Sequence, residues 1–157
     1  MYQQLQQAGV DFEYQKYIPF AGCGLNPDGA YETKHAFVDF VIAKPWGYIL
    51  LECDEEQHRG RDPSCDPRRR VDIAASVALG SEHKLLVLRY NPDSYKVDGK
   101  TRRTSKGDRI QRLLALLEYE PAGFERLFLF FDHASDAILP DVASEWSEGA
   151  RAVSRLA

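Results

Sequence analysis

The chain has 157 residues, which is enough for one compact domain with a single hydrophobic core. It is 44% hydrophobic and 28% charged, a composition typical of globular proteins and too apolar for a disordered chain. No stretch approaches the roughly 18 consecutive apolar residues of a membrane span, and a net charge of -4 argues against strong nonspecific binding to phosphates. We therefore treat residues 1–157 as a single domain with no membrane segment.

The beginning of the chain and its cysteines indicate an intracellular protein, either cytoplasmic or nuclear. The first residues lack the basic start and apolar core of a secretory signal. The three cysteines, Cys23, Cys53 and Cys65, are odd in number and form no CxxC pair. Reduced thiols are therefore expected in place of a disulfide framework.

The N-terminal region predicts a short helix followed by a strand. Residues 1–8 contain good helix formers and are followed by Gly9, a typical helix C-cap. Residues 12–20 alternate apolar and polar side chains, which is typical of a strand. Residues 21–31 contain three glycines and a proline, so we expect a loop.

A β-hairpin is the clearest structural prediction. Residues 37–42 and 48–54 are rich in β-branched and aromatic side chains, and the Pro- and Gly-containing segment 44–47 between them predicts a turn. The remaining pattern predicts a helix over 67–80, a strand over 84–90, a helix over 108–119, a strand over 126–132 and a helix over 143–156. This order predicts an α/β fold, a three-layer α/β/α sandwich around a mixed sheet.

Acidic residues on the hairpin predict a metal site. If the turn is centred between Pro45 and Trp46, Asp39 lies directly opposite Glu52. Like charges in that position are destabilising unless a cation compensates them. Strand alternation places Asp54 on the same side as Glu52, so three carboxylates would converge at one end of the hairpin.

Carboxylate oxygens favour a hard ion such as Mg²⁺, with Mn²⁺ as an alternative, and such an ion would polarise a phosphodiester and activate water. His58 follows at a distance suited to handling the proton. The alternative interpretation is that Asp39 and Glu52 are solvent-facing acids and His58 a surface residue. A zinc site using Cys53, His58, Cys65 and Cys23 is a further alternative, although the spacing is irregular, and Cys53 is also suited to core packing.

The same residues resemble a known family. Asp39-Phe-Val-Ile followed by Glu52-Cys-Asp-Glu-Glu-Gln-His58 is similar to the Asp…Glu-x-Asp-x-x-x-His core of PD-(D/E)XK, or restriction-endonuclease-like, nucleases. The nearest branch is that of very-short-patch-repair-type endonucleases and their uncharacterised relatives, in which a basic segment, a helix and a strand follow, as in residues 68–73 and 86–90 here. The resemblance covers residues 5–95.

The resemblance implies an αβββαβ core, with Asp39 and Glu52 as metal ligands, Asp54 as a further ligand or near neighbour, and His58 as the proton-handling residue. Two departures matter. Asp54 occupies the place of the family's lysine, and Glu55 the place of a frequent glycine. Either the proton chemistry has passed to His58 or to an arginine of residues 68–70, or activity is weakened or lost.

Basic residues on both sides of the acidic segment predict a nucleic-acid partner. Phosphate contacts of this kind position a backbone without reading its sequence. The candidates are Arg59, Arg61, Arg68, Arg69, Arg70, Arg102 and Arg103, together with Lys96, Lys100, Lys106, Arg109 and Arg112. A solvated helix face is the alternative for the second tract, and Trp46, Tyr90 and Tyr95 could stack on bases or lie in the core.

The sequence thus favours a Mg²⁺-dependent endonuclease acting on DNA or RNA, as a homodimer or with a separate targeting protein. A catalytically weak nucleic-acid-binding module and a zinc-stabilised interaction domain are the alternatives.

Overall fold

The computed structural model describes residues 1–19, 35–55, 84–133 and the backbone of 142–144. The predicted loop over 21–31 and the predicted helix over 67–80 lie outside these residues. Within the described part of the chain, no helix is long and apolar enough to cross a membrane.

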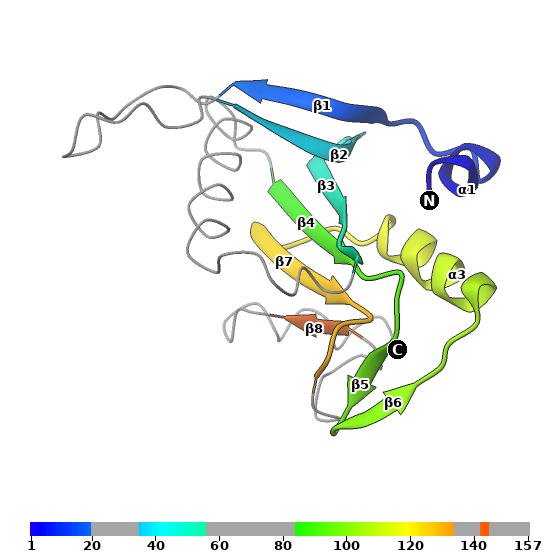
Figure 1. The fold of residues 1–157 in the computed structure, drawn as a ribbon. Coiled ribbons are helices and arrows are strands. Elements are labelled where there is room, and N and C mark those ends of the chain that lie inside the picture. The colour runs from blue at the N-terminus through cyan, green and yellow to red at the C-terminus, as the bar shows by residue number, and fades with distance from the viewer. Residues whose placement is uncertain (20–34, 56–83, 134–141, 145–157) are drawn as a thin grey trace, which may run out of the picture.

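A six-stranded mixed sheet forms the centre of the fold (Figure 1). Its spatial order is β1-β2-β3-β4-β7-β8, with β3, β4 and β7 parallel and the remaining neighbours antiparallel. The strands are β1 (Glu13–Pro19), β2 (His35–Lys44), β3 (Gly47–Cys53), β4 (Lys84–Tyr90), β7 (Phe124–Leu129) and β8 (Val142–Ser144). The predicted hairpin is confirmed as β2 and β3, and the predicted strands over 12–20 and 84–90 as β1 and β4.

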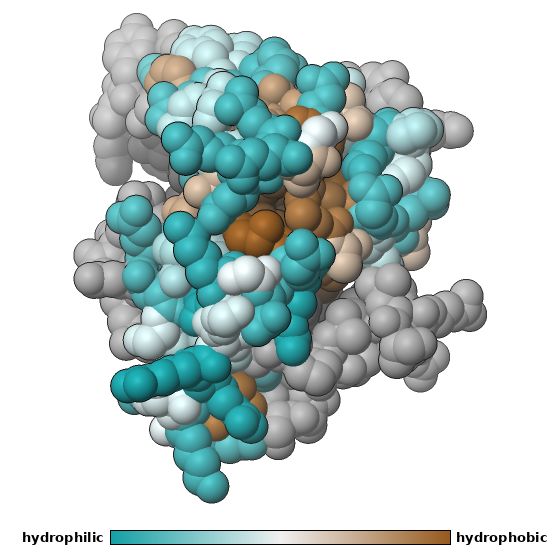
Figure 2. Space-filling model, turned by 90° about the vertical axis from the view of Figure 1, so that its right-hand side faces the viewer, coloured by the Kyte–Doolittle hydropathy of each residue, from teal (hydrophilic) through white to brown (hydrophobic). Residues whose placement is uncertain are grey.

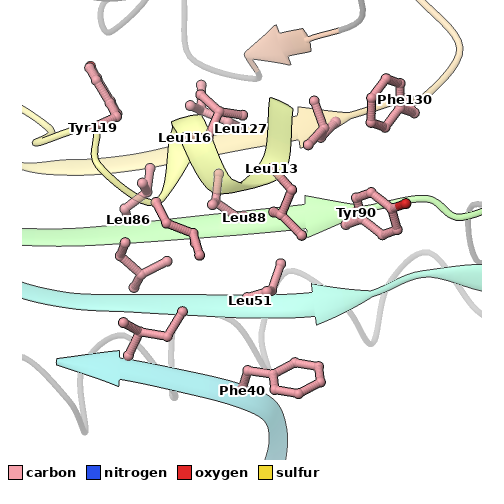
Figure 3. Close-up of a cluster of buried hydrophobic side chains, with 14 of the residues drawn as sticks. Phe40, Leu51, Leu86, Leu88, Tyr90, Leu113, Leu116, Tyr119, Leu127 and Phe130 are labelled. Atoms are coloured by element: carbon pink, nitrogen blue, oxygen red, sulfur yellow. The ribbon is translucent and has the colours of Figure 1, made fainter. Parts of the chain in front are cut away.

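Two helices pack on one face of this sheet (Figure 1). They are α1 (Tyr2–Gln7) and α3 (Lys106–Leu116). Leu113 and Leu116 of α3 point toward the strands, where they meet Leu88 of β4 and Leu127 of β7 in the main core cluster. Figure 2 shows apolar residues gathered on this side of the molecule and framed by hydrophilic ones.

The opposite face of the sheet has a second buried cluster. It consists of Ile18, Ala36, Val38, Val41, Leu50, Leu85 and Val87. Because β3 and β4 contribute to both clusters, both of their faces are buried, as expected for parallel strands. The general α/β class with a mixed sheet is therefore confirmed.

Local signals explain where the helices begin and end. The predicted end of α1 at Gly9 is confirmed with a shift of one residue: Ala8 is the C-cap, and Gly9 after it has a φ of 72°, a left-handed conformation that glycine adopts at little cost. The helix predicted over 108–119 begins earlier, because the Ser105 side chain caps it by accepting a hydrogen bond from the Asp108 N–H at 3.1 Å.

Two elements differ from the sequence prediction. The basic tract from Lys96 to Arg112 was predicted to contain no strand, but it overlaps a second, two-stranded sheet of β5 (Tyr95–Val97) and β6 (Lys100–Arg102). Asp98 and Gly99 between them have φ values of 50° and 73°, as an Asp-Gly hairpin turn requires. The helix predicted over 143–156 was wrong at its start, where β8 pairs with β7 and completes the edge of the sheet.

Gly47 is a position where the fold requires glycine. Its φ is 150°, and an added Cβ would lie 2.0 Å from the Lys84 carbonyl oxygen at the start of β4. We expect Gly47→Ala to lower the free energy of unfolding by about 3 kcal/mol, because the β3–β4 pairing must open to admit the methyl group. Urea denaturation measures this change.

Gly107→Ala is the matched control. Gly107 lies in α3, and the nearest atom to a Cβ added there is the Ser105 Oγ, at 3.8 Å. This substitution should be neutral or stabilising by up to about 1 kcal/mol, because alanine favours helix. Equal effects at the two glycines would contradict the close approach of β3 to β4.

Candidate functional site

The β2–β3 hairpin has the predicted register. Pairs run from Phe40↔Leu51 to Lys44↔Gly47, and the residue numbers of each pair add up to 91. Continued by one residue, this register places Asp39 opposite Glu52, and both side chains are half-buried. The two acids that the sequence singled out thus follow directly on Phe40↔Leu51, the last pair of the hairpin.

The alternation of β2 shifts by one residue at Asp39. Val38 and Val41 belong to the same buried cluster, whereas Phe40 lies in the cluster on the other face of the sheet. On β1, the residue opposite Asp39 is Gln15, whose φ of 47° is rare for a non-glycine residue. Irregularities of this kind redirect a side chain, and here Asp39 is turned toward β3.

The Asp39 carboxylate is anchored by the backbone of β3. The Cys53 N–H donates a hydrogen bond to Asp39 Oδ2 at 2.9 Å, so a side-chain oxygen satisfies this strand donor. A carboxylate offers about four acceptor positions, and one hydrogen bond leaves its ability to ligate a cation intact. The contact fixes Asp39 next to the carboxyl end of β3.

The Cys53 thiol stays protonated beside this carboxylate. Burial, followed by the negative charge of Asp39, raises the pKa of Cys53 to about 11. The side chain packs against the main core cluster. Cys53 therefore has the packing role expected from its place on the strand.

Asp54 lies on the same face as Glu52 but in a different environment. It is fully buried and forms an ion pair with Arg89 Nε of β4, itself 2% exposed. Its backbone N–H donates to the Tyr90 carbonyl oxygen at 2.7 Å, extending the β3–β4 pairing beyond the end of β3. The acid that follows Cys53 is thus engaged by an arginine from the neighbouring strand.

The carboxyl ends of β3, β4 and β7 meet at one edge of the sheet (Figure 1). Asp54, Arg89 and Asn91 all lie at or just beyond this edge, which is where open α/β sheets place their ligands. Within residues 1–19, 35–55 and 84–133, no three His, Cys, Asp or Glu side chains come together as a metal-binding group. The expected convergence of three carboxylates is thus not seen there.

A pair of carboxylates nevertheless fits one class of ion. Mg²⁺ is commonly held by one or two carboxylates together with waters and substrate phosphate oxygens. Asp39 and Glu52 are half-buried and offer carboxylate oxygens of this type.

Several predicted residues lie outside the described part of the chain. They are His58, Arg59, Arg61, Arg68, Arg69 and Arg70, together with Cys23 and Cys65 of the alternative zinc site. Arg102 at the end of β6 and Arg103 after it are described, and both are exposed, as a phosphate contact requires. Lys96, Lys100, Lys106 and Arg112 are exposed as well.

Arg109 does not belong with these exposed cations. It is 6% exposed, and its Nη1 donates to the carbonyl oxygens of Asn91 at 3.0 Å and Asp93 at 2.8 Å. Its guanidinium also lies 4.8 Å from the centre of the Phe130 ring. Arg109 thus connects the loop after β4 to α3. The sequence did not predict this role, because Arg109 lies among the basic residues interpreted as phosphate contacts.

The aromatic residues considered for base stacking have a structural role. Tyr90 and Tyr95 are 4% and 2% exposed and belong to the main core cluster, and Trp46 packs against that cluster. Core packing was therefore the correct alternative for these three residues.

No family model matches the chain, and searches of curated proteins and of solved structures found no significant similarity. The function therefore has to be argued from the geometry of the site.

The raised pKa of Cys53 predicts slow alkylation. At pH 8, a pKa of about 11 instead of 9.0 lowers the thiolate fraction by about 100-fold. In a Cys23→Ser/Cys65→Ser background, we expect the iodoacetamide rate to keep rising about tenfold per pH unit from pH 8 to pH 10. Asp39→Asn should raise the rate, because it removes a negative charge that disfavours the thiolate.

The control is the same Cys23→Ser/Cys65→Ser protein unfolded in urea. Its iodoacetamide rate should stop rising with pH near the ordinary pKa of cysteine. A folded protein whose rate levels off near pH 9 would contradict the environment described for Cys53.

Proposed function

We propose that this protein is a metal-dependent endonuclease that hydrolyses phosphodiester bonds of DNA or RNA, with Asp39 and Glu52 as the ligands of Mg²⁺. The observation that carries the proposal is that two half-buried acids, Asp39 and Glu52, lie one residue beyond Phe40↔Leu51, the last pair of the β2–β3 register. Carboxylates on neighbouring strands repel one another, and a cation bound between them relieves this repulsion.

Further support comes from the surroundings of the pair. The Asp39 carboxylate is held in place by the Cys53 N–H, so one candidate ligand is preorganised on a strand. The strand order β1-β2-β3-β4, with antiparallel pairs followed by a parallel one, agrees with the αβββαβ core that the resemblance implies. The exposed Arg102 and Arg103 are suited to phosphate contacts.

When bound, Mg²⁺ would polarise the scissile phosphate and lower the pKa of a coordinated water. The protein's own part is to hold the ion with Asp39 and Glu52. In this proposal His58 accepts the proton from the attacking water.

A weakly catalytic nucleic-acid-binding module is the second candidate function. It is favoured by one observation: Asp54 stands where the family has lysine and forms an ion pair with Arg89. Such a module would bind nucleic acid through the same exposed arginines without cleaving it.

Cleavage of supercoiled plasmid DNA, and of a structured RNA in parallel, tests the first proposal. We expect nicking that requires Mg²⁺ or Mn²⁺ and falls about 100-fold or more in Asp39→Asn and in Glu52→Gln, which corresponds to roughly 3 kcal/mol of lost transition-state stabilisation. Glu118→Gln is the matched control. This acid is 79% exposed and pairs with Lys44 at the surface, so activity should be unchanged.

Metal-dependent cleavage that survives both site substitutions would refute the assignment of the ligands. Intact substrates together with retained binding would favour the second candidate function.

The salt dependence of nucleic-acid affinity tests the basic surface. Arg102→Gln and Arg103→Gln should each weaken binding to all sequences and lower the slope of log K against log salt by about 1, because each removes one phosphate contact. Lys16→Gln removes a partly exposed lysine of β1 that pairs with Glu13, and it should leave the slope unchanged. An unchanged slope in both arginine variants would exclude this surface as the binding face.

A further inference from the structure

The ion pair between Asp54 and Arg89 differs from the surface pairs of this protein. Both side chains are removed from solvent, with Asp54 0% and Arg89 3% exposed. By contrast, the side chains of the Lys84–Glu120 pair are 35% and 52% exposed. Surface pairs contribute little to stability, whereas removing one partner of a buried pair leaves an uncompensated charge in the interior.

The position of the pair connects it to Glu52. In the parallel β3–β4 register, Arg89 is directly opposite Glu52, and Cys53 is opposite Tyr90. Asp54 follows at once, bound through its side chain to Arg89 and through its backbone N–H to the Tyr90 carbonyl. The pair therefore fastens the end of β3 to β4 immediately after the residue that would ligate the metal.

The chemistry of arginine opposes a metal at Asp54. A guanidinium does not lose its proton in proteins, so Arg89 is a permanent cation. A divalent ion bound to Asp54 would displace Arg89 from the Asp54 carboxylate. It would also place two more positive charges beside Arg89 in a buried environment. Asp39 and Glu52 are only half-buried, so a cation would meet them in a less apolar environment than at Asp54.

We propose that Asp54 and Arg89 form a positioning pair that holds Glu52 in place for metal binding, and that Asp54 is not itself a metal ligand. This inference rests on the proposed function. It revises the ligand set from three carboxylates to two and assigns a role to Arg89, which the sequence did not single out.

Mn²⁺ binding by isothermal titration calorimetry, without any substrate, separates the two roles of Asp54. For a positioning pair, Asp54→Asn and Arg89→Met should each weaken Mn²⁺ binding about tenfold or more, because outer partners of metal ligands have effects of that size. The double variant, which carries no buried charge at either position, should recover to within about threefold of the wild-type affinity.

If Asp54 were a ligand, the results would differ in sign. Arg89→Met would then strengthen Mn²⁺ binding by releasing the carboxylate, and the double variant would bind as poorly as Asp54→Asn alone. Either result would overturn the inference. If Asp54→Asn fails to fold, Arg89→Lys, which keeps the buried cation, is compared with the double variant. A large loss of Mn²⁺ affinity in the double variant alone would also overturn the inference.

Urea unfolding of the same four proteins provides a readout that does not depend on metal. We expect the two single substitutions to be strongly non-additive, with the double variant more stable than either. A wild-type chain that binds no Mn²⁺ would refute the proposed function and the positioning role with it. A non-additive result in urea would in that case still establish the pair as a structural one, so the two failures are distinguishable.

Discussion

The parallel pairing of β3 with β4 determines where the candidate site lies. The two strands pair from Gly47↔Lys84 to Cys53↔Tyr90, and each contributes to the buried clusters on both faces of the sheet. Because parallel strands end at the same edge, Glu52, Asp54 and Arg89 arrive together there. The close approach at Gly47 fixes the other end of this pairing, so a register slip would move the ends of both strands apart.

Burial divides the three acids of the hairpin into two kinds. Asp39 and Glu52 are half-buried, and Asp39 is oriented by the Cys53 N–H, so both can face a cation from the solvent side. Asp54 is fully buried, and a charge in that position requires a permanent partner, which Arg89 supplies from β4. Two acids that are two positions apart, Glu52 and Asp54, thus lie in different environments, and the depth of each side chain is the difference between them.

Local patterns predicted much of the sheet because their physical cause is local. The apolar runs of β2, β3 and β4, the turn at Gly47 and the helix end at Gly9 follow from the conformations these residues prefer. The hairpin register followed from the turn position, and it placed Asp39 opposite Glu52 without any knowledge of the fold. The Asp98-Gly99 turn was equally readable, and its hairpin was missed because the basic residues around it were interpreted as a binding tract.

The sequence alone determined the β2–β3 hairpin and its register, because these depend on residues close together in the chain. Only the tertiary structure decided the roles of Asp54, Arg89 and Arg109. Arg89 lies 35 positions from Asp54, and Arg109 binds carbonyl groups 16 and 18 positions away. Whether such a charge is solvated or buried against a partner depends on which strands and helices are neighbours in the fold. A local sequence pattern does not predict these neighbours.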